Sequence, residues 1–145
     1  ISLVDVLMVN DSEARQLTGE YSLVKAAKKI MGMGPKYLVI KKGEHGALLF
    51  HEDQVFFAPA LPLEEVFDPT GAGDTFAGGF IGHIVRTKDI SFENMKTAII
   101  VGSAMASYCV EKFGTERLRE ISKVEISDRI AEFVDLVNFD IKLVV

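Results

Sequence analysis

The chain has 145 residues, of which 48% are apolar, and its 16 basic and 21 acidic side chains give a formal charge of −5. This length and apolar share suffice for one domain with a hydrophobic core, and they exclude a disordered chain, which combines low hydrophobicity with high charge. The acidic balance argues against a nucleic-acid surface, because phosphate binding depends on clustered lysine and arginine.

The single cysteine, Cys109, excludes an internal disulfide and a cysteine-rich metal site. It fits a reducing compartment, and we therefore expect a cytoplasmic protein. No apolar run is long enough to cross a membrane. Because the sequence begins at Ile1 within an apolar run, we expect a fragment of a longer protein.

The first third of the chain predicts a strand and two helices. Leu3–Val9 is an apolar run with one charge, which is typical of a buried strand. Asn10 ends it, and a short helix is predicted up to Thr18, closed by Gly19. Ser22 is suited to cap a second helix, which ends where glycines and a proline follow.

The middle of the chain predicts another strand and then a hairpin. Tyr37–Ile40 is predicted to be a strand, and Ala47–His51 is predicted to pair with Gln54–Ala58 across a turn at Glu52 and Asp53. Strands that alternate with helices predict an α/β fold with a mainly parallel sheet, which this hairpin makes mixed.

The last part of the chain predicts three helices and a final strand. The helices cover about residues 74–86, 91–111 and 128–137, and the third starts behind Ser127. Ile141–Val145 is the predicted strand.

The segment from Asp68 to Gly79, DPTGAGDTFAGG, is the most informative. Gly71 and Gly73 allow a tight turn that brings backbone amides close to another group. Because the amides precede a helix, whose first N–H groups lack partners, the segment is an anion site. It is neither a phosphate-binding loop, since no lysine follows the glycines, nor a dinucleotide fingerprint, since Phe76 replaces the third glycine.

Asp74 follows these glycines at the head of the helix. A carboxylate repels phosphate, so a simple phosphate binder gains nothing from it, whereas phosphoryl transfer requires a group that accepts the proton of the attacking hydroxyl. The amides of Gly71, Ala72 and Gly73 would then stabilise charge on the transferred group. The alternative is that Asp74 only caps the helix, and the spacing does not separate the two interpretations.

The run from Asp68 to Phe80 closely resembles the C-terminal signature of the ribokinase-like, or PfkB-type, carbohydrate kinases. The resemblance extends from Asn10 to beyond Gly114. It implies a three-layer α/β fold, with a mainly parallel twisted sheet and helices on both faces. It also implies that residues 1–145 are the nucleotide-binding, C-terminal part of such a kinase domain.

The same resemblance implies roles for the loop. The family's residue that matches Asp74 is the catalytic base, which deprotonates the hydroxyl that attacks the γ-phosphate of ATP. The residues that match Gly71, Ala72 and Gly73 form the anion hole. In many members a monovalent cation such as K⁺ is held by groups that match Asp68 and the carbonyl of Thr70. The resemblance therefore implies that Asp68 and Thr70 are metal ligands.

Asn10 and Glu13 resemble the family's Asn-x-x-Glu motif, which is linked to Mg²⁺ and to phosphate positioning. One carboxylate would suffice, because water and ATP oxygens supply the other Mg²⁺ ligands. The spacing is also that of a helix capping box, and both interpretations can hold together.

The segment from Lys41 to Gly46 resembles the family's turn that touches the nucleotide, in which a threonine stands where this chain has Lys41. The lysine could meet a phosphate as a point charge or lie in solvent. Gly43 is predicted to contact the nucleotide. Ser103 matches a position beside adenine, or else it is a small residue that allows close helix packing.

The resulting hypothesis is an enzyme that uses ATP and Mg²⁺ to phosphorylate an alcohol group of a sugar or nucleoside. We expect a small-molecule substrate, no nucleic acid and no membrane, with a homodimer as one candidate assembly. The alternatives are a non-catalytic nucleotide-binding module or inactive fragment, and a truncation product whose exposed sheet edge drives oligomer formation.

Overall fold

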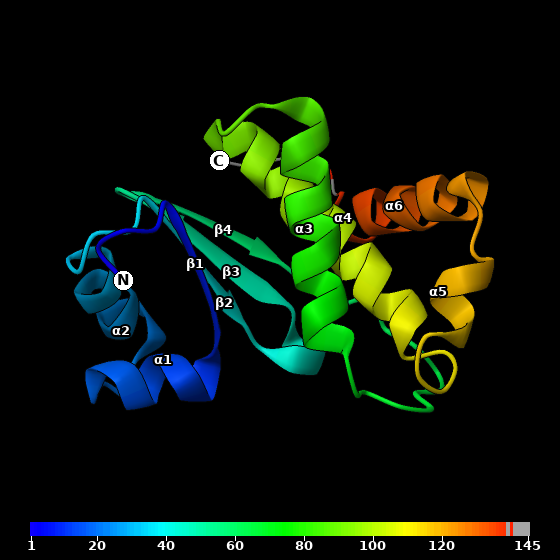
Figure 1. Ribbon diagram of the computed structural model, residues 1–145, viewed down its shortest axis with the longest axis horizontal. Coiled ribbons are helices and arrows are strands. Elements are labelled where there is room, and N and C mark those ends of the chain that lie inside the picture. Colours follow the sequence, from blue (N-terminus) through cyan, green and yellow to red (C-terminus); the bar gives the residue numbers. More distant parts are fainter. Residues whose placement is uncertain (139, 141–145) are drawn as a thin grey trace.

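The computed structural model describes residues 1–138 and 140, so the strand predicted at Ile141–Val145 lies outside the described residues (Figure 1). Within those residues, no helix combines the length and the apolar character needed to span a bilayer.

The elements follow the alternation that the sequence predicts. In chain order they are β1 (Val6–Asn10), α1 (Asp11–Thr18), α2 (Leu23–Met31), β2 (Tyr37–Lys41), the 3₁₀ turn η1 (Gly43–His45), β3 (Ala47–His51), β4 (Gln54–Ala58), α3 (Ala72–Thr87), α4 (Phe92–Cys109), α5 (Glu116–Glu120) and α6 (Lys123–Val137).

The boundary of the last helix is the largest error of the prediction. Helix α6 begins at Lys123 rather than near Asp128, because Ser122 and not Ser127 is its cap. The Ser122 hydroxyl accepts the N–H of Glu125, and the Glu125 carboxylate accepts the N–H of Ser122.

The sheet has the order β1-β2-β3-β4. Strand β1 is parallel to β2, while the β2–β3 and β3–β4 pairs are antiparallel, so the sheet is mixed and the hairpin lies where it was predicted. In the parallel pair Asn10 lies opposite Lys41, which places both residues at the same end of the sheet. Among residues 1–138 and 140, therefore, one of the three strand pairings is parallel.

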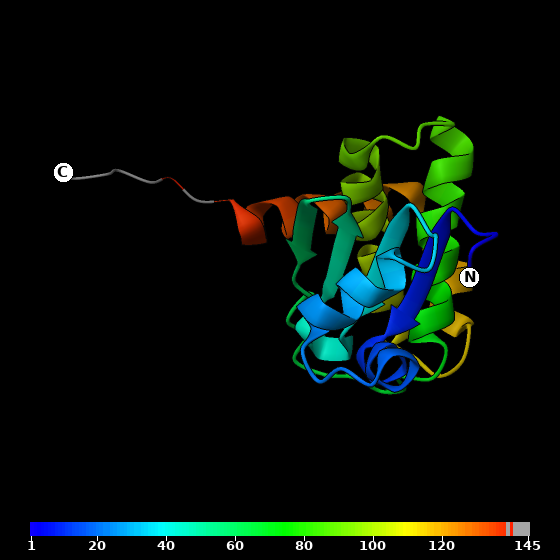
Figure 2. The same cartoon turned by 90° about the vertical axis from the view of Figure 1, so that its left-hand side faces the viewer.

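Helices cover both faces of the sheet, in three layers (Figure 1). Because strand residues alternate between faces, Leu38 and Ile40 pack with Ile30 of α2, whereas Val39 packs with Phe80 of α3. In the view of Figure 2, α1 and α2 lie in front of the strands, with α3 and α4 behind them. The three-layer α/β class is thus confirmed.

Two glycines bring α3 and α4 into close contact. A Cβ atom on Gly102 would lie 2.7 Å from the carbonyl oxygen of Phe76, and one on Gly79 would lie 3.0 Å from the Met105 side chain. Only glycine fits at position 102, because the near atom belongs to the backbone, whereas a Cβ atom at position 79 would require the Met105 side chain to shift. This contact fixes the second turn of α3 against α4.

Candidate active site

A cleft of about 770 Å³ opens at the end of the sheet where β2 stops. One wall is the turn that leads from β2 to β3, and the other is formed by the start of α3 and the inner side of α4. The connection between β4 and α3 closes the third side.

Five of the residues predicted from the sequence line this cleft: Lys41, Gly43, Ala72, Gly73 and Ser103. The remaining predicted residues lie outside its lining: Asn10, Glu13, Asp68, Thr70, Gly71 and Asp74. The structure therefore brings together the turn after β2 (residues 41–46), the loop that leads into α3 (residues 67–73, called the glycine loop below) and α4, which are far apart in the sequence.

The glycine loop ends in the cap of α3. Gly71 is the N-cap residue and has a φ of 81°, a left-handed conformation that favours glycine. The N–H of Ala72 donates to the Pro69 carbonyl at 3.2 Å, so this amide is already engaged. The first turn of α3 offers its remaining amides and its dipole to the cleft.

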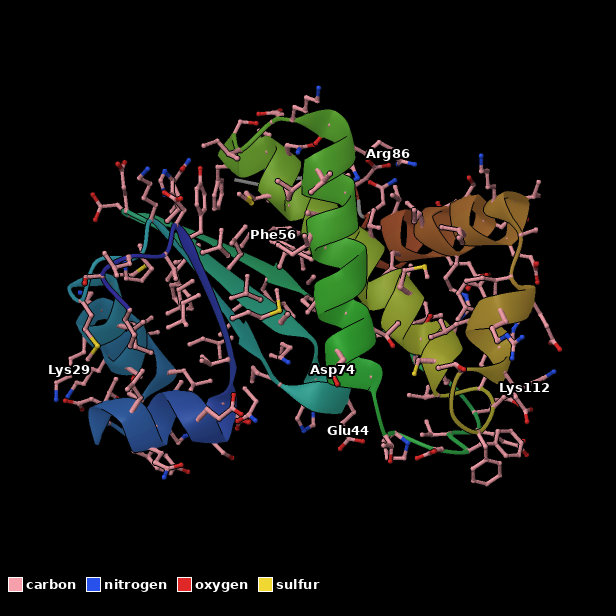
Figure 3. All side chains as sticks on the ribbon, in the orientation of Figure 1. Lys29, Glu44, Phe56, Asp74, Arg86 and Lys112 are labelled. Atoms are coloured by element: carbon pink, nitrogen blue, oxygen red, sulfur yellow. The ribbon has the colours of Figure 1, made fainter. Side chains whose placement is uncertain are left out.

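Asp74 is the third residue of α3 and is exposed. Because the N-cap is Gly71 and no side chain makes a cap hydrogen bond, the interpretation of Asp74 as the helix cap is wrong. Figure 3 shows Asp74 at the end of α3 that faces the turn carrying Glu44. Its carboxylate takes part in none of the ion pairs of residues 1–138 and 140.

Lys41 reaches the glycine loop from the end of β2. A Cβ atom on Gly73 would lie 3.0 Å from the Lys41 Nζ atom, so the ammonium group rests on the backbone of the loop. Lys41 is half-buried and, in the part of the chain that the structure describes, has no carboxylate partner within ion-pair distance. The alternative of a lysine that lies in solvent does not fit this position.

Asn10 and Glu13 form a complete capping box at the start of α1. The Asn10 Oδ1 atom accepts the Glu13 N–H at 2.8 Å, and the Glu13 Oε2 atom accepts the Asn10 N–H at 2.7 Å. The capping interpretation is therefore confirmed. Since Asn10 lies opposite Lys41, the box is at the cleft end of the sheet.

Asp68 and Thr70 shape the approach to the loop. The Asp68 Oδ1 atom accepts the N–H of Thr70 at 2.9 Å, and hydrogen bonds to Thr70, above all to its backbone N–H, lower the pKa of Asp68. The Thr70 carbonyl accepts the thiol of Cys109 at 3.7 Å, and the Val110 carbonyl accepts the N–H of Phe67 at 2.9 Å. The loop is thus attached to the C-terminal end of α4.

The described residues contain no cluster of three histidine, cysteine, aspartate or glutamate side chains suited to a metal ion. Asp68 and the Thr70 carbonyl offer oxygen atoms, the donor type that hard cations prefer. Any cation at the loop would need further backbone or substrate oxygens.

Ser103 lies on α4 and is 9% exposed. It lines the cleft, and the close packing of α3 against α4 is made by its neighbour Gly102 instead. The packing alternative for Ser103 is therefore the weaker one.

An apolar wall of the cleft was missed by the sequence reasoning. Leu61, Leu63 and Val66 of the connection line the cleft together with Ala106 and Val110 of α4, a lining suited to a flat aromatic base. The available signal was the length of the connection, residues 59–71, since long connections without regular structure are often binding loops.

Comparisons with known proteins find relatives among the carbohydrate and nucleoside kinases. The sequence model described as "pfkB family carbohydrate kinase" matches residues 1–121. A cytidine kinase from Thermococcus kodakarensis is 36% identical over 125 residues, which are 85% of this chain and 38% of that protein. A ribokinase from Staphylococcus aureus is 29% identical over 133 residues, which are 86% of this chain and 42% of that protein.

Solved structures agree as well. The aminoimidazole riboside kinase from Salmonella enterica, in complex with aminoimidazole riboside and an ATP analogue, matches with a TM-score of 0.78 at 27% identity, over 89% of this chain and 43% of that chain. Arabidopsis thaliana ribokinase, in complex with ribose and ATP, matches with a TM-score of 0.76 at 26% identity, over 89% of this chain and 41% of that one. The chain therefore spans less than half the length of these relatives. It belongs to the pfkB family of carbohydrate kinases and has their ribokinase-like fold.

Proposed function

We propose that this chain is the nucleotide-binding, C-terminal part of a kinase that transfers the γ-phosphate of ATP to an alcohol group of a sugar or nucleoside. The observation that supports this most directly is the arrangement at the start of α3. An exposed carboxylate, Asp74, lies in the first turn of α3, three residues after the Gly71 cap, and its neighbour Gly73 lines the same cleft as Lys41, whose ammonium group it contacts.

In this proposal Asp74 accepts the proton of the acceptor hydroxyl as its oxygen attacks the γ-phosphorus. The bond between the γ-phosphorus and the bridging oxygen breaks, and ADP leaves. The amides of Gly71 and Gly73, with Lys41, stabilise the negative charge that develops on the transferred group. The apolar wall of the cleft holds the base of the nucleotide.

The proposed nucleotide enters as its Mg²⁺ complex, so the metal is part of the substrate. Glu13 lies three residues after the end of β1, and its Oε2 atom accepts the N–H of Asn10. A monovalent cation beside Asp68 and Thr70 would add positive charge next to the loop. The assignments of Glu13, Asp68 and Thr70 rest on the oxygen atoms that these residues offer to a cation.

The acceptor class rests on the relatives. Two of the protein relatives are a cytidine kinase and a ribokinase, and one of the structural relatives was solved with aminoimidazole riboside. Each of these three names refers to ribose or to a compound that contains it, so ribose and ribonucleosides are the first acceptors to test.

The test is Asp74→Asn in the full-length protein, with ADP release measured on ribose, cytidine and fructose. We expect kcat to fall by about 10²–10⁴ with the ATP dissociation constant unchanged, because a general base contributes this much to the rate. Asp53→Asn, at an exposed hairpin turn, is the matched control and should leave kcat unchanged. Normal turnover by Asp74→Asn would refute the base assignment.

The same assay tests the alternative function. If the full-length protein binds ATP but releases no ADP with any acceptor, the chain is a nucleotide-binding module rather than an enzyme.

A further inference from the structure

The C-terminal turn of α4 has two sides with different contacts. On the inner side, Ser107 and Val110 line the cleft. The Val110 carbonyl accepts the N–H of Phe67, at the start of the glycine loop. Cys109 contacts the Thr70 carbonyl of the same loop. Any displacement of this turn would therefore move the cleft wall and the loop together.

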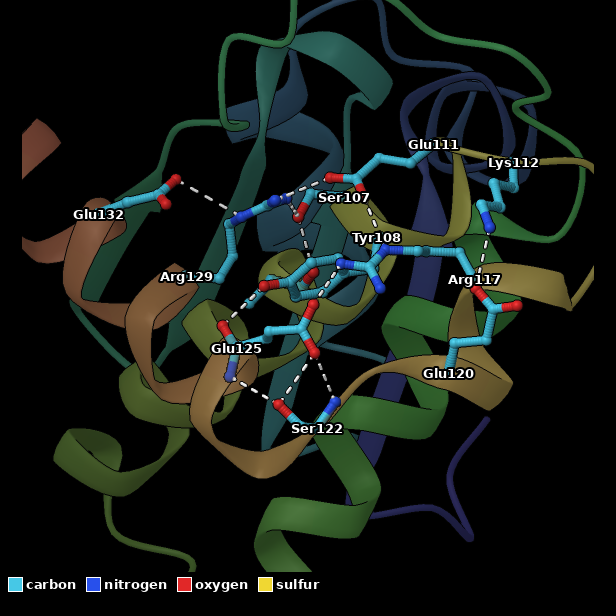
Figure 4. A network of polar contacts seen from close by, with 11 residues as sticks. Ser107, Tyr108, Glu111, Lys112, Arg117, Glu120, Ser122, Glu125, Arg129 and Glu132 are labelled. Carbon is cyan, nitrogen blue, oxygen red and sulfur yellow. Dashed lines mark hydrogen bonds and ion pairs between the residues drawn. The ribbon is translucent and has the colours of Figure 1, made fainter.

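The outer side of the turn is held by α6 through Arg129 (Figure 4). The Arg129 Nη1 atom donates to the Ser107 hydroxyl at 2.8 Å, and its Nη2 atom donates to the Glu111 carboxylate at 2.7 Å. The guanidinium carbon lies 4.0 Å from the centre of the Tyr108 ring. One side chain of α6 thus contacts three residues of the turn or just beyond it.

These contacts are shielded from water. The Arg129 side chain is 12% exposed, Ser107 is 7% exposed and Tyr108 is 3% exposed. Hydrogen bonds are electrostatically stronger in such surroundings than in water. The Ser107 hydroxyl also donates to the Ala104 carbonyl at 2.7 Å, so both its donor and an acceptor site are used.

Arg117 provides an internal comparison. It also contacts the Tyr108 ring, at 4.9 Å, and it also forms two ion pairs, with Glu111 at 3.0 Å and Glu125 at 2.7 Å. Neither partner of Arg117 lines the cleft. Arg129 likewise forms two ion pairs, with Glu111 and with Glu132 at 3.5 Å, and its side chain is the more buried of the two. Of the two arginines, only Arg129 is bonded to a residue that lines the cleft, Ser107.

We propose that Arg129 is a positioning residue for nucleotide binding, which acts through Ser107 and Glu111 to hold the C-terminal turn of α4, and with it the glycine loop, in the binding geometry. This inference rests on the proposed function, since it takes the cleft to be the nucleotide site. Helix α6 lies beyond residues 1–121, the part that the family's sequence model matches. The contact of Arg129 with Ser107 is therefore supplied by a helix outside the segment that the family model matches.

The first experiment measures the ATP dissociation constant of the full-length protein by calorimetry, well below the unfolding temperature of each variant. We expect Arg129→Met to raise it about fivefold and Arg117→Met to leave it unchanged within about twofold, as couplings of this kind are small. Arg129→Lys should give an intermediate value, because one ammonium group cannot bond both Ser107 and Glu111. Equal effects of the two methionine variants, or no effect of Arg129→Met, would overturn the proposal.

The second experiment needs no nucleotide. Cys109 is the only cysteine among residues 1–145 and is 3% exposed. In full-length protein with any cysteine outside these residues replaced by serine, its rate of reaction with the thiol reagent DTNB reports on the contact between α4 and the loop. We expect the rate to rise in Arg129→Met and not in Arg117→Met. Equal rates in both would overturn the proposal.

The two readouts separate the possible failures. If the wild-type protein binds no ATP, the proposed function fails, and the thiol rates alone decide whether Arg129 positions the loop. If the wild type binds ATP and the variants do not differ, only the positioning role fails. Should Arg129→Met not fold, Arg129→Lys answers both questions.

Discussion

The contact between α3 and α4 predicts a sharp effect of Gly102→Ala. The new Cβ atom would lie 2.7 Å from the Phe76 carbonyl oxygen and 3.3 Å from the Phe76 ring, and the backbone atom cannot rotate away. Overpacking costs up to about 3 kcal/mol, and replacing a helical glycine by alanine returns about 1 kcal/mol. The expected net loss is therefore about 2 kcal/mol.

The assay is thermal unfolding followed by circular dichroism. For a chain of this size each kcal/mol moves Tm by about 4 °C, so Gly102→Ala should lower Tm by about 8 °C. Gly82→Ala is the matched control, because a Cβ atom there meets nothing within 4 Å and alanine favours the helix. We expect it to raise Tm. A Gly102→Ala protein as stable as the wild type would refute the close approach of the two helices.

Three further predictions concern the cleft and the helix ends. Lys41→Met should raise the ATP dissociation constant about tenfold and leave that of adenosine unchanged, because a charged hydrogen bond to phosphate is lost; an equal effect on both ligands would count against this contact. Hydrogen bonds, first from Arg117, lower the pKa of Glu125 from 4.5 to about 2, so its ionised form stabilises the fold above pH 4.5 and this contribution disappears as the pH falls towards 2. Glu125→Gln should accordingly melt below the wild type at pH 6, with a difference that closes by about pH 2, and a constant difference would contradict the linkage. Asn10→Ala should cost about 1 kcal/mol of stability while Asn10→Ser costs much less, since serine also caps helices; the same Tm for both would contradict the cap.

Local sequence signals predicted most of the fold. Gly19 ended α1 and Ser22 began α2, because cap residues act within one turn of the chain. The start of α6 was wrong although Ser122 and Glu125 have capping-box spacing, since Ser127 offered a competing signal. The short elements η1 and α5 contain too few residues to show a periodic pattern.

The candidate site was predictable where it is contiguous. The glycine loop and Asp74 lie within one short segment, so their chemistry was visible in the sequence. The apolar wall and the approach of Lys41 to Gly73 depend on contacts between distant segments, which no local pattern encodes. The contact between Arg129 and Ser107 belongs to the same class.

The connection between β4 and α3, residues 59–71, leads from the sheet to the helix that forms one wall of the cleft. It carries exposed glutamates at positions 64 and 65. A ligand in the cleft would contact both walls and oppose their separation. At about a hundred times its dissociation constant, such a ligand adds about 2.7 kcal/mol to the free energy of unfolding. Cleavage by a glutamate-specific protease should therefore slow when a ligand binds, which gives a way to screen compounds that requires neither turnover nor a known acceptor.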